Sequence, residues 1–238
     1  MVGSRTDTGV VLVSGGLDSL ITLSIALKEC DEVAVMHATY GQRTALRERR
    51  AFEDICRHFK IANKAVIDLS HIASFGGSSL TSAVGEIPSG PQWGGIPSTY
   101  VPFRNANFLA AAVSWAEAME ANAVYIGVVE EDSSGYPDCR RTFIQHFQRV
   151  IEEGTRPASG IMIRVPLISL NKSQIVRLGV GFNAPFELSW SCYRNSGDKA
   201  CGSCESCLIR LRGFHRAGIE DPLQYDKISE ENREFIEF

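Results

Sequence analysis

The chain has 238 residues, of which 44% are hydrophobic and 22% charged, and its formal net charge is −4. This composition excludes collagen-like, coiled-coil and largely disordered proteins, and no apolar run approaches the ~18 residues that a membrane-spanning helix needs. A chain of this length can fold as a single domain, here residues 1–238, without disulfides. The first residues are polar and lack the apolar stretch of a signal peptide, so we expect a cytoplasmic protein without a membrane partner.

Acidic side chains are concentrated at the C-terminus. Residues 220–238 contain seven acidic and two basic side chains, which leaves 22 basic and 21 acidic ones in the rest of the chain. Proteins that bind nucleic acids usually carry a strong basic excess. The near-neutral body therefore favours a small polar substrate over a nucleic-acid partner, and residues 219–238 are treated as an acidic tail.

Apolar runs alternate with segments of helical periodicity along residues 9–182. Short, continuous apolar runs are typical of strands that are covered on both faces of a sheet. The predicted elements are strand 9–13, helix 18–30, strand 32–38, helix 44–59, strand 64–69, helix 105–120, strand 123–128, helix 140–153, strand 161–165 and helix 172–178. This order predicts an α/β core at 9–182, an open, mostly parallel sheet with helices on both faces and ligands at the carboxyl ends of the strands.

Residues 76–97 interrupt the alternation with six glycines and three prolines. A connection of this length is usually a binding loop, a lid or a disordered segment. The sequence leaves a functional lid and plain disorder open.

A glycine-rich loop follows the first predicted strand. Ser14-Gly-Gly-Leu-Asp-Ser19 joins that strand to the next helix, and glycines there let the backbone turn tightly around a ligand. The helix N-terminus offers unpaired N–H groups and a partial positive charge, which suit a phosphate. Asp18 is expected either to cap the helix or to help hold Mg²⁺. The spacing fits neither a Walker loop nor the dinucleotide fingerprint. It resembles the pyrophosphate-binding loop of the N-type ATP pyrophosphatases, which implies that a substrate is adenylated.

Four of the seven cysteines lie within sixteen residues, in segment 183–218. These are Cys192, Cys201, Cys204 and Cys207, with the spacing C-x8-C-x2-C-x2-C. Four thiolates complete the tetrahedral coordination of zinc and leave no position for water, so we expect a structural site. An iron–sulfur cluster is the alternative, since it also takes four thiolates; the lack of a further redox motif favours zinc. We expect the other three, Cys30, Cys56 and Cys139, to be small buried residues.

Together these motifs make the chain similar to the 7-cyano-7-deazaguanine synthases of queuosine biosynthesis, over about residues 10–218. The matching stretches are 13–19, 40–43, 96–105, 134–140, 166–167, 172, 190–193, 201–207, 210 and 213–214. The sequence departs from the family at two places: the family often has Gly where Phe103 stands, and a polar residue or Cys where Val129 stands.

The resemblance implies an adenine nucleotide alpha hydrolase-like fold, a homodimer and an ATP-dependent carbon–nitrogen ligase. Its substrates would be 7-carboxy-7-deazaguanine, ammonium and two ATP, and its product the nitrile. The chemistry is consistent, because a carboxylate loses both oxygens on becoming a nitrile and adenylation makes each of them leave with AMP. The primary amide lies between the two rounds.

Residue roles follow as hypotheses. ATP and Mg²⁺ are assigned to Val13, Ser14, Gly15, Gly16, Leu17, Asp18, Ser19, Leu20, Ile21, Thr22 and Leu23. Lys172, at the start of a predicted helix, is expected to neutralise charge that develops on the phosphates; the alternative is an exposed helix-terminal lysine. Arg104 is expected to hold the substrate carboxylate by two hydrogen bonds, and Asn105 to cap the helix that begins there.

The loop after the fourth predicted strand supplies the remaining substrate candidates. These are Tyr136, Asp138 and Arg140, and an aspartate such as Asp138 or Asp132 can accept hydrogen bonds from the N–H groups of a guanine-like base. Cys139 has no neighbouring histidine in the sequence, and adenylation needs no nucleophilic thiol, so we expect it to have a packing role.

Three other functions remain open. The first alternative is a tRNA-modifying ATP pyrophosphatase, which keeps the adenylation chemistry but acts on RNA; the near-neutral body argues against it. A relative that joins carboxydeazaguanine to another acceptor, such as a protein amine, would share the activation step. A non-catalytic zinc-ribbon binding module would hydrolyse no ATP and would bind nucleic acid in a salt-sensitive manner. The arginine-rich helix 43–57 also contains acidic residues, which favours a solvated or subunit-facing surface.

Overall fold

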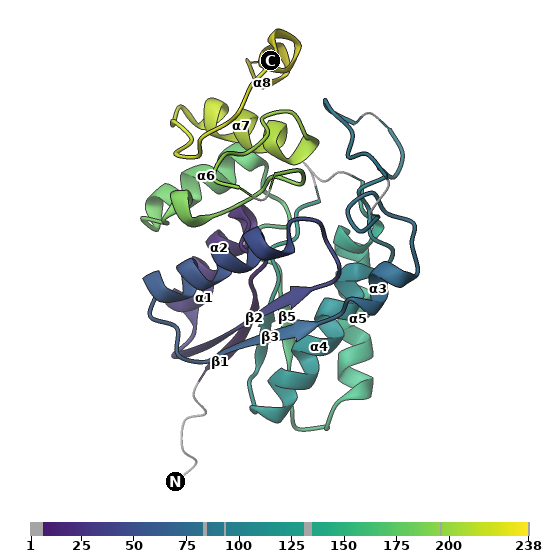
Figure 1. Ribbon diagram of the computed structural model, residues 1–238. Coiled ribbons are helices and arrows are strands. Elements are labelled where there is room, and N and C mark those ends of the chain that lie inside the picture. Colours follow the sequence, from purple (N-terminus) through teal and green to yellow (C-terminus); the bar gives the residue numbers. More distant parts are fainter. Residues whose placement is uncertain (1–6, 83–84, 93, 131–134, 196, 238) are drawn as a thin grey trace.

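A five-stranded, entirely parallel sheet lies at the centre of the protein (Figure 1). The computed structural model describes residues 7–82, 85–92, 94–130, 135–195 and 197–237. The strand order is β3-β2-β1-β4-β5. The strands are β1 (Thr8–Leu12), β2 (Glu32–Thr39), β3 (Lys64–Asp68), β4 (Ala123–Tyr125) and β5 (Met162–Arg164). The predicted open parallel sheet is confirmed.

The central strand β1 is apolar because both of its faces are covered. Val11 and Val13 pack into one hydrophobic core, and Val10 and Leu12 into the other. Successive side chains of a strand point to opposite faces, so a strand buried on both sides must be apolar at every position. This is why residues 9–13 form an unbroken apolar run.

Helices form a layer on each face of the sheet (Figure 1). One core contains residues of α1 (Leu17–Glu29), α2 (Ala45–His58), α6 (Lys172–Gly181) and α7 (Glu205–Ala217). The other contains residues of α4 (Arg104–Ala118) and α5 (Arg141–Gly154). Short helical segments complete the described chain: α3 (His71–Ser74), η1 (Pro137–Cys139), η2 (Phe186–Leu188) and α8 (Glu230–Glu237). None of the helices in the described residues has the length and apolar character needed to cross a bilayer.

The fourth strand ends earlier than the predicted 123–128. β4 stops at Tyr125, and the chain then passes over the beginning of α1. At Gly127 an added Cβ would lie 2.8 Å from Thr22 Oγ1 and 3.0 Å from the carbonyl carbon of Asp18. The apolar pattern continued through residue 128, but this close passage takes the chain out of the sheet.

The C-terminal helix α7 was not among the predicted elements. It begins directly after Cys204 and packs against α6. Leu208 and Phe214 are buried on it, so an apolar helical spacing was present. The spacing of the cysteines predicts a compact metal-binding turn. In the structure the last cysteine of the motif, Cys207, already lies in α7.

Residues 219–228 of the acidic tail are anchored to the four-cysteine segment. Asp221 accepts hydrogen bonds from Arg210 Nε at 2.8 Å and Nη2 at 3.0 Å, and from the Tyr225 hydroxyl at 2.7 Å. Only 2% of the Arg210 side chain and 4% of the Asp221 side chain are exposed. Further along, α8 packs on α7, and the Arg212 guanidinium lies 4.3 Å from the Phe235 ring centroid.

This buried ion pair generates a stability prediction. Replacing Asp221 with alanine leaves the Arg210 charge buried without its partner, which costs about 3–5 kcal/mol. The matched control is Asp198→Ala, because Asp198 lies 3.6 Å from Arg50 in a pair whose side chains are 91% and 66% exposed. An exposed pair contributes about 0–1 kcal/mol. Urea unfolding of the two variants measures the difference, and equal losses would contradict the assignment.

Candidate active site

A cavity of about 270 Å³ lies at the carboxyl edge of the sheet, beyond the ends of β1, β2 and β4. Its walls are the glycine loop, residues 126–129, the start of α4, residues 190–193 and the first half of α7. The sheet topology predicted a ligand site at this edge, and the structure has a cavity there.

The glycine loop turns tightly between α2 and the segment that follows η2. Gly15 has φ of +91°, and an added Cβ would lie 2.7 Å from the carbonyl oxygen of Glu48. The Gly15 carbonyl accepts a hydrogen bond from the Trp190 N–H at 2.8 Å. Both the backbone angle and the close approach require glycine at this position.

The serines of the loop are bonded to each other. Ser14 Oγ donates to Ser19 Oγ at 3.1 Å and accepts from the Gly16 N–H at 3.2 Å. Gly16 is the N-cap residue of α1, so no side chain caps this helix. Asp18 lies inside the helix, and the expectation that it caps α1 is wrong.

The residues predicted to contact ATP divide into two groups. Six of them line the cavity: Val13, Ser14, Gly16, Leu17, Asp18 and Ser19. Leu20, Ile21 and Leu23 are fully buried in the core behind α1, and Thr22 bonds the Asp18 carbonyl at 2.8 Å. The first turn of α1 therefore faces the cavity, and the second holds the helix to the sheet.

Lys172 reaches the glycine loop from α6. Its Nζ donates to both carboxylate oxygens of Asp18, at 2.7 and 2.8 Å. The helix start is fixed by Asn171, which forms a reciprocal capping box with Gln174. Only 13% of the lysine side chain is exposed. The alternative of an exposed helix-terminal lysine is therefore wrong.

Arg104 is a partly buried cation on another wall of the cavity. Its Nη1 donates to the Tyr40 hydroxyl at 3.0 Å, and the guanidinium lies 5.1 and 5.6 Å from the ring centroids of Tyr40 and Phe108. Its buried Nε has no hydrogen-bond partner within the described part of the chain, and no acidic side chain described here forms an ion pair with it. Burial also raises the pKa of Tyr40 to about 12, so this phenol stays neutral. The site can therefore bind an anion.

The residue before Arg104 explains one departure from the family pattern. Phe103 precedes α4 in the left-handed conformation, with φ of +56° and ψ of +25°, and 59% of it is exposed. Glycine adopts this conformation without the steric cost that a Cβ brings. The glycine that the family often has at this position fits the same turn.

The candidate substrate residues of the loop after β4 do not all reach the cavity. Tyr136 lines it, with its hydroxyl donating to Thr99 Oγ1 at 2.9 Å. Asp138 is buried, and its carboxylate accepts from the Asn105 N–H at 2.9 Å in the first turn of α4. Arg140 is exposed at the N-cap of α5. Neither Asp138 nor Arg140 lines the cavity, and Asp132 lies outside the described residues.

Asp138 instead positions the helix that carries Arg104. Burial raises the pKa of the Asp138 carboxyl, against the opposing effect of the Asn105 N–H bond. Asn105 lies within α4, where its side chain donates to Cys139 Sγ at 3.2 Å, so the expectation that it caps the helix is wrong. Burial raises the pKa of Cys139 to about 12, which leaves a neutral thiol with little nucleophilic character.

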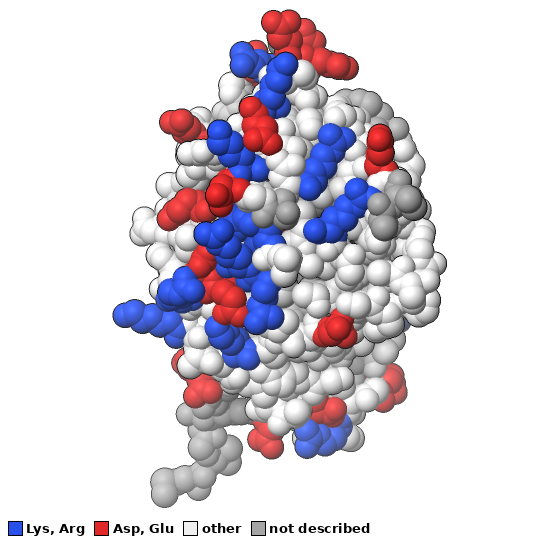
Figure 2. Space-filling view, in the orientation of Figure 1, with Lys and Arg blue, Asp and Glu red and all other residues white. Residues whose placement is uncertain are grey.

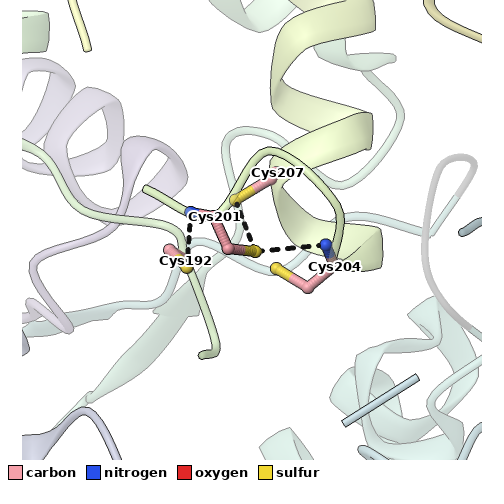
Figure 3. A group of neighbouring side chains, drawn as sticks. All are labelled: Cys192, Cys201, Cys204 and Cys207. Carbon is pink, nitrogen blue, oxygen red and sulfur yellow. Dashed lines mark hydrogen bonds between the residues drawn. The ribbon is translucent and has the colours of Figure 1, made fainter. Parts of the chain in front are cut away.

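The four cysteines of the motif converge on one point (Figure 3). Their sulfurs all lie within 4.8 Å of one another, and those of Cys201 and Cys207 are 3.9 Å apart. Tetrahedral coordination at about 2.3 Å places sulfurs about 3.8 Å apart. Backbone N–H groups point at the sulfurs: Cys192 Sγ accepts from Asn195 at 3.3 Å, and Cys201 Sγ from Cys204 at 3.3 Å. The set fits a single metal ion held by four thiolates.

The described part of residues 76–97 packs on this four-cysteine segment. Leu80 and Ile87 share a hydrophobic cluster with Trp190 and the cysteines. Ser89 forms an isolated antiparallel bridge with Cys204. The described part of residues 76–97 is therefore folded against the four-cysteine cluster.

Several cavity residues had no predicted role. They are Tyr40, Phe108, Trp190, Ser191, Tyr193, Ser206, Ile209 and Arg210. Tyr40, Trp190 and Arg210 belong to stretches that carried the family resemblance, which was the available signal. Their convergence depends on five segments meeting at one sheet edge, and no local pattern encodes that.

Comparison with known proteins identifies the family. A sequence profile described as "Queuosine biosynthesis protein QueC" matches residues 8–218. The chain belongs to the QueC family. It is 52% identical over 220 residues to the 7-cyano-7-deazaguanine synthase of Chlorobaculum tepidum, covering 91% of this chain and 96% of that protein. It is 50% identical over 218 residues to the corresponding synthase of Chlorobium chlorochromatii, covering 91% and 95%. The predicted resemblance is confirmed.

A solved structure supports the fold. A 4-thiouridine synthetase in complex with RNA and with bound ATP is similar at a TM-score of 0.50 and 17% identity, covering 97% of this chain and 50% of that one. At this identity the likeness concerns the fold alone, which is the adenine nucleotide alpha hydrolase-like fold expected for the QueC family.

The cysteine geometry predicts one metal ion per chain. Replacing Cys204 with serine removes a thiolate from a closed four-ligand set, so we expect elemental analysis to show that most of the metal is lost. Because metal binding contributes on the order of 10 kcal/mol to the folding of such segments, the thermal unfolding temperature should fall as well. Cys56→Ser is the control, since Cys56 is buried in the core of the sheet and far from the motif in sequence. Unchanged metal content in Cys204→Ser would contradict the site.

Proposed function

We propose that this chain is a 7-cyano-7-deazaguanine synthase, a cytoplasmic ligase that uses two ATP to convert 7-carboxy-7-deazaguanine and ammonia to the nitrile. The observation that carries the proposal is the placement of the α1 N-terminus and the Arg104 guanidinium on walls of the same cavity, with no hydrogen-bond partner for the Arg104 Nε among the described residues. The helix N-terminus suits the phosphates of ATP, and the guanidinium suits the substrate carboxylate. The names of the 50–52% identical relatives support the same reaction.

The phosphates of ATP would lie against the first turn of α1. Free backbone N–H groups and the positive end of the helix dipole face the cavity there, together with the hydroxyls of Ser14 and Ser19. The contact with Asp18 holds the positively charged Lys172 next to these N–H and hydroxyl groups. Mg²⁺, when held by Asp18, would offset part of the phosphate charge. Lys172 would stabilise the charge that develops when pyrophosphate leaves.

Arg104 would orient the acid for the first adenylation. A carboxylate oxygen attacks the α-phosphorus of ATP, pyrophosphate leaves, and a mixed anhydride with AMP results. Ammonia then attacks the acyl carbon, AMP departs with one oxygen, and a proton is lost to give the primary amide. In the second round the amide oxygen attacks the α-phosphorus of ATP, pyrophosphate leaves and a proton is lost. Loss of AMP, which carries the second oxygen, and of a second proton then leaves the nitrile.

The four-cysteine site would hold zinc in a structural role. All four ligands are protein thiolates, which closes the coordination shell and leaves no position for a reacting water. The fit of the sulfurs to a single tetrahedral ion supports zinc over an iron–sulfur cluster. Iron would show visible absorption, which zinc lacks.

A mass-spectrometric assay tests the reaction. Incubation of the full chain with ATP, ammonium and carboxydeazaguanine should give the mass of the nitrile and release two pyrophosphates for each nitrile formed. Without ammonium, pyrophosphate release should stop after the first adenylation. Unchanged substrate in the complete mixture would refute the proposal. A product joined to an amine other than ammonia would show that ammonia is not the acceptor.

The lysine role has its own test. Lys172→Met should lower kcat for pyrophosphate release by about 10²–10³-fold, because a preorganised charge near the leaving group is lost. Lys64→Met is the control, since Lys64 is 40% exposed and pairs with Glu53 away from the cavity. Equal kcat values for the two variants would show that Lys172 has no catalytic role.

We also propose that the protein is a homodimer, formed through α4 and α5. Phe103, Phe143 and Phe147 form a continuous aromatic row, with ring centroids 6.1 and 5.7 Å apart, and Val150 is 61% exposed beyond it. α4 has no charged residue between Arg104 and its last turn. In Figure 2 charged side chains gather over α2 and near the C-terminus and are sparser on the right, although several also lie toward the lower right and along the lower edge.

The charges of α5 favour a second copy as the partner. The helix is flanked by Arg140 and starts with Arg141, whereas Glu152 and Glu153 lie in its last turn. In a two-fold symmetric pair the same surface meets itself, so antiparallel α5 helices place the basic end of one opposite the acidic end of the other.

Sedimentation measures this assembly. The wild-type chain should sediment as a dimer, and Val150→Arg should sediment as a monomer because a charge is placed in the apolar interface. Val180→Arg is the control, since Val180 is 46% exposed on α6, on the other face of the sheet. A dimer that survives Val150→Arg would exclude this face.

A further inference from the structure

Gly213 lies in direct contact with the stem of Lys172. An added Cβ at Gly213 would lie 2.4 Å from Lys172 Cγ, 2.9 Å from its Cβ and 3.2 Å from its carbonyl carbon. Carbon atoms do not approach to 2.4 Å without repulsion, so any side chain here would displace the lysine stem or separate α7 from α6. Gly213 is buried within α7.

Glycine is otherwise unfavourable at this position. In the interior of a helix it is destabilising relative to alanine, because it loses more backbone freedom on folding. Gly213 has no positive φ that would require it. The close contact with Lys172 is therefore the feature of this site that excludes every other residue.

The contact is close to the reactive end of the lysine. Two methylene groups separate Cγ from Nζ, which lies 2.7 and 2.8 Å from the Asp18 oxygens. A displacement of Cγ by several tenths of an ångström therefore moves the ammonium group relative to the first turn of α1. Misplacement of a catalytic group by about 1 Å can cost about 10²-fold in rate.

Gly213 lies in α7 one turn after the last residues of this helix that line the cavity. Ile209 and Arg210 line the cavity, and they lie four and three residues before Gly213, respectively, which places all three on one side of the helix. α7 thus borders the cavity along its first half and meets Lys172 at the next turn.

We propose that Gly213 is a positioning residue for Lys172: its missing side chain sets where the ammonium group stands against Asp18 and the α1 N-terminus. The inference rests on the proposed catalytic role of Lys172. It assigns α7, the helix that begins at the four-cysteine site, a direct part in setting the phosphate end of the cavity.

The test is a double-mutant cycle on kcat for pyrophosphate release. Gly213→Ala should lower kcat by about 10- to 100-fold, measured per folded molecule after thermal unfolding has given the folded fraction. In the Lys172→Met background the same substitution should cost no further kcat, because the two residues act as a unit. A merely structural glycine would lower activity equally in both backgrounds.

Two glycines of α6 are matched controls. Gly181 has open space around it, so Gly181→Ala should leave kcat unchanged and should not lower the unfolding temperature. Gly179 is tightly packed like Gly213: an added Cβ there would lie 2.6 Å from Ile21 and Phe186, and Lys172 is not among its nearest neighbours. Gly179→Ala should therefore lower the unfolding temperature without lowering kcat per folded molecule.

The outcomes separate this inference from the proposed function. If Lys172→Met leaves kcat unchanged, the role of Lys172 fails, and the positioning role fails with it. If Lys172→Met is impaired but Gly213→Ala is not, the positioning role alone is overturned. If Gly213→Ala does not fold, Lys172→Gly is added, because it removes the two lysine atoms nearest to the new Cβ. The double variant should then fold. If it does not, the contact with Lys172 is not what excludes a side chain at Gly213.

Discussion

The ion pair between Lys172 and Asp18 is the contact on which the cavity depends. It joins residues 154 positions apart and holds the beginning of α6 against the first turn of α1. Each partner is in tight contact with a glycine: Gly213 lies against the lysine stem, and Gly127 against the backbone of Asp18. Helix N-termini are brought close together here, which concentrates positive potential at one end of the cavity. A polyanionic ligand is the natural complement of that arrangement.

A second wall of the cavity has a different kind of constraint. Arg104 lies among aromatic rings with a buried Nε that has no hydrogen-bond partner among the described residues, and a buried polar group without a partner is costly. Asp138 does not supply that partner, because its carboxylate is bonded to the backbone of α4. The guanidinium is thus left for an anion that enters the cavity. The carboxylate of the proposed substrate meets that requirement, while the buried aspartate keeps the helix, and so the arginine, in place.

The four-cysteine segment forms part of the same site. Its residues 190–193 line the cavity, and the last cysteine of the motif lies in the first turn of α7, whose next turns border the cavity and contact Lys172. Residues 219–228 of the tail hold the other side of the segment through the buried pair of Arg210 and Asp221. A metal ion held by the four cysteines would make this segment rigid without a large core of its own, which would suit a wall that has to keep its position.

Several local features of the protein could be predicted from its sequence. The apolar run of β1, the need for glycine at Gly15 and the spacing of the four cysteines each follow from short-range geometry, and the structure agrees with them. Which charges face each other depends on the tertiary fold. It pairs Lys172 with Asp18, leaves Arg104 Nε without a hydrogen-bond partner among the described residues and turns Asp138 away from the cavity. It also ended β4 early and extended the cysteine motif into α7. The reason is physical: periodicity and spacing act over a few residues, whereas these contacts depend on how closely separate helices approach, and that distance is set by glycines far apart in the chain.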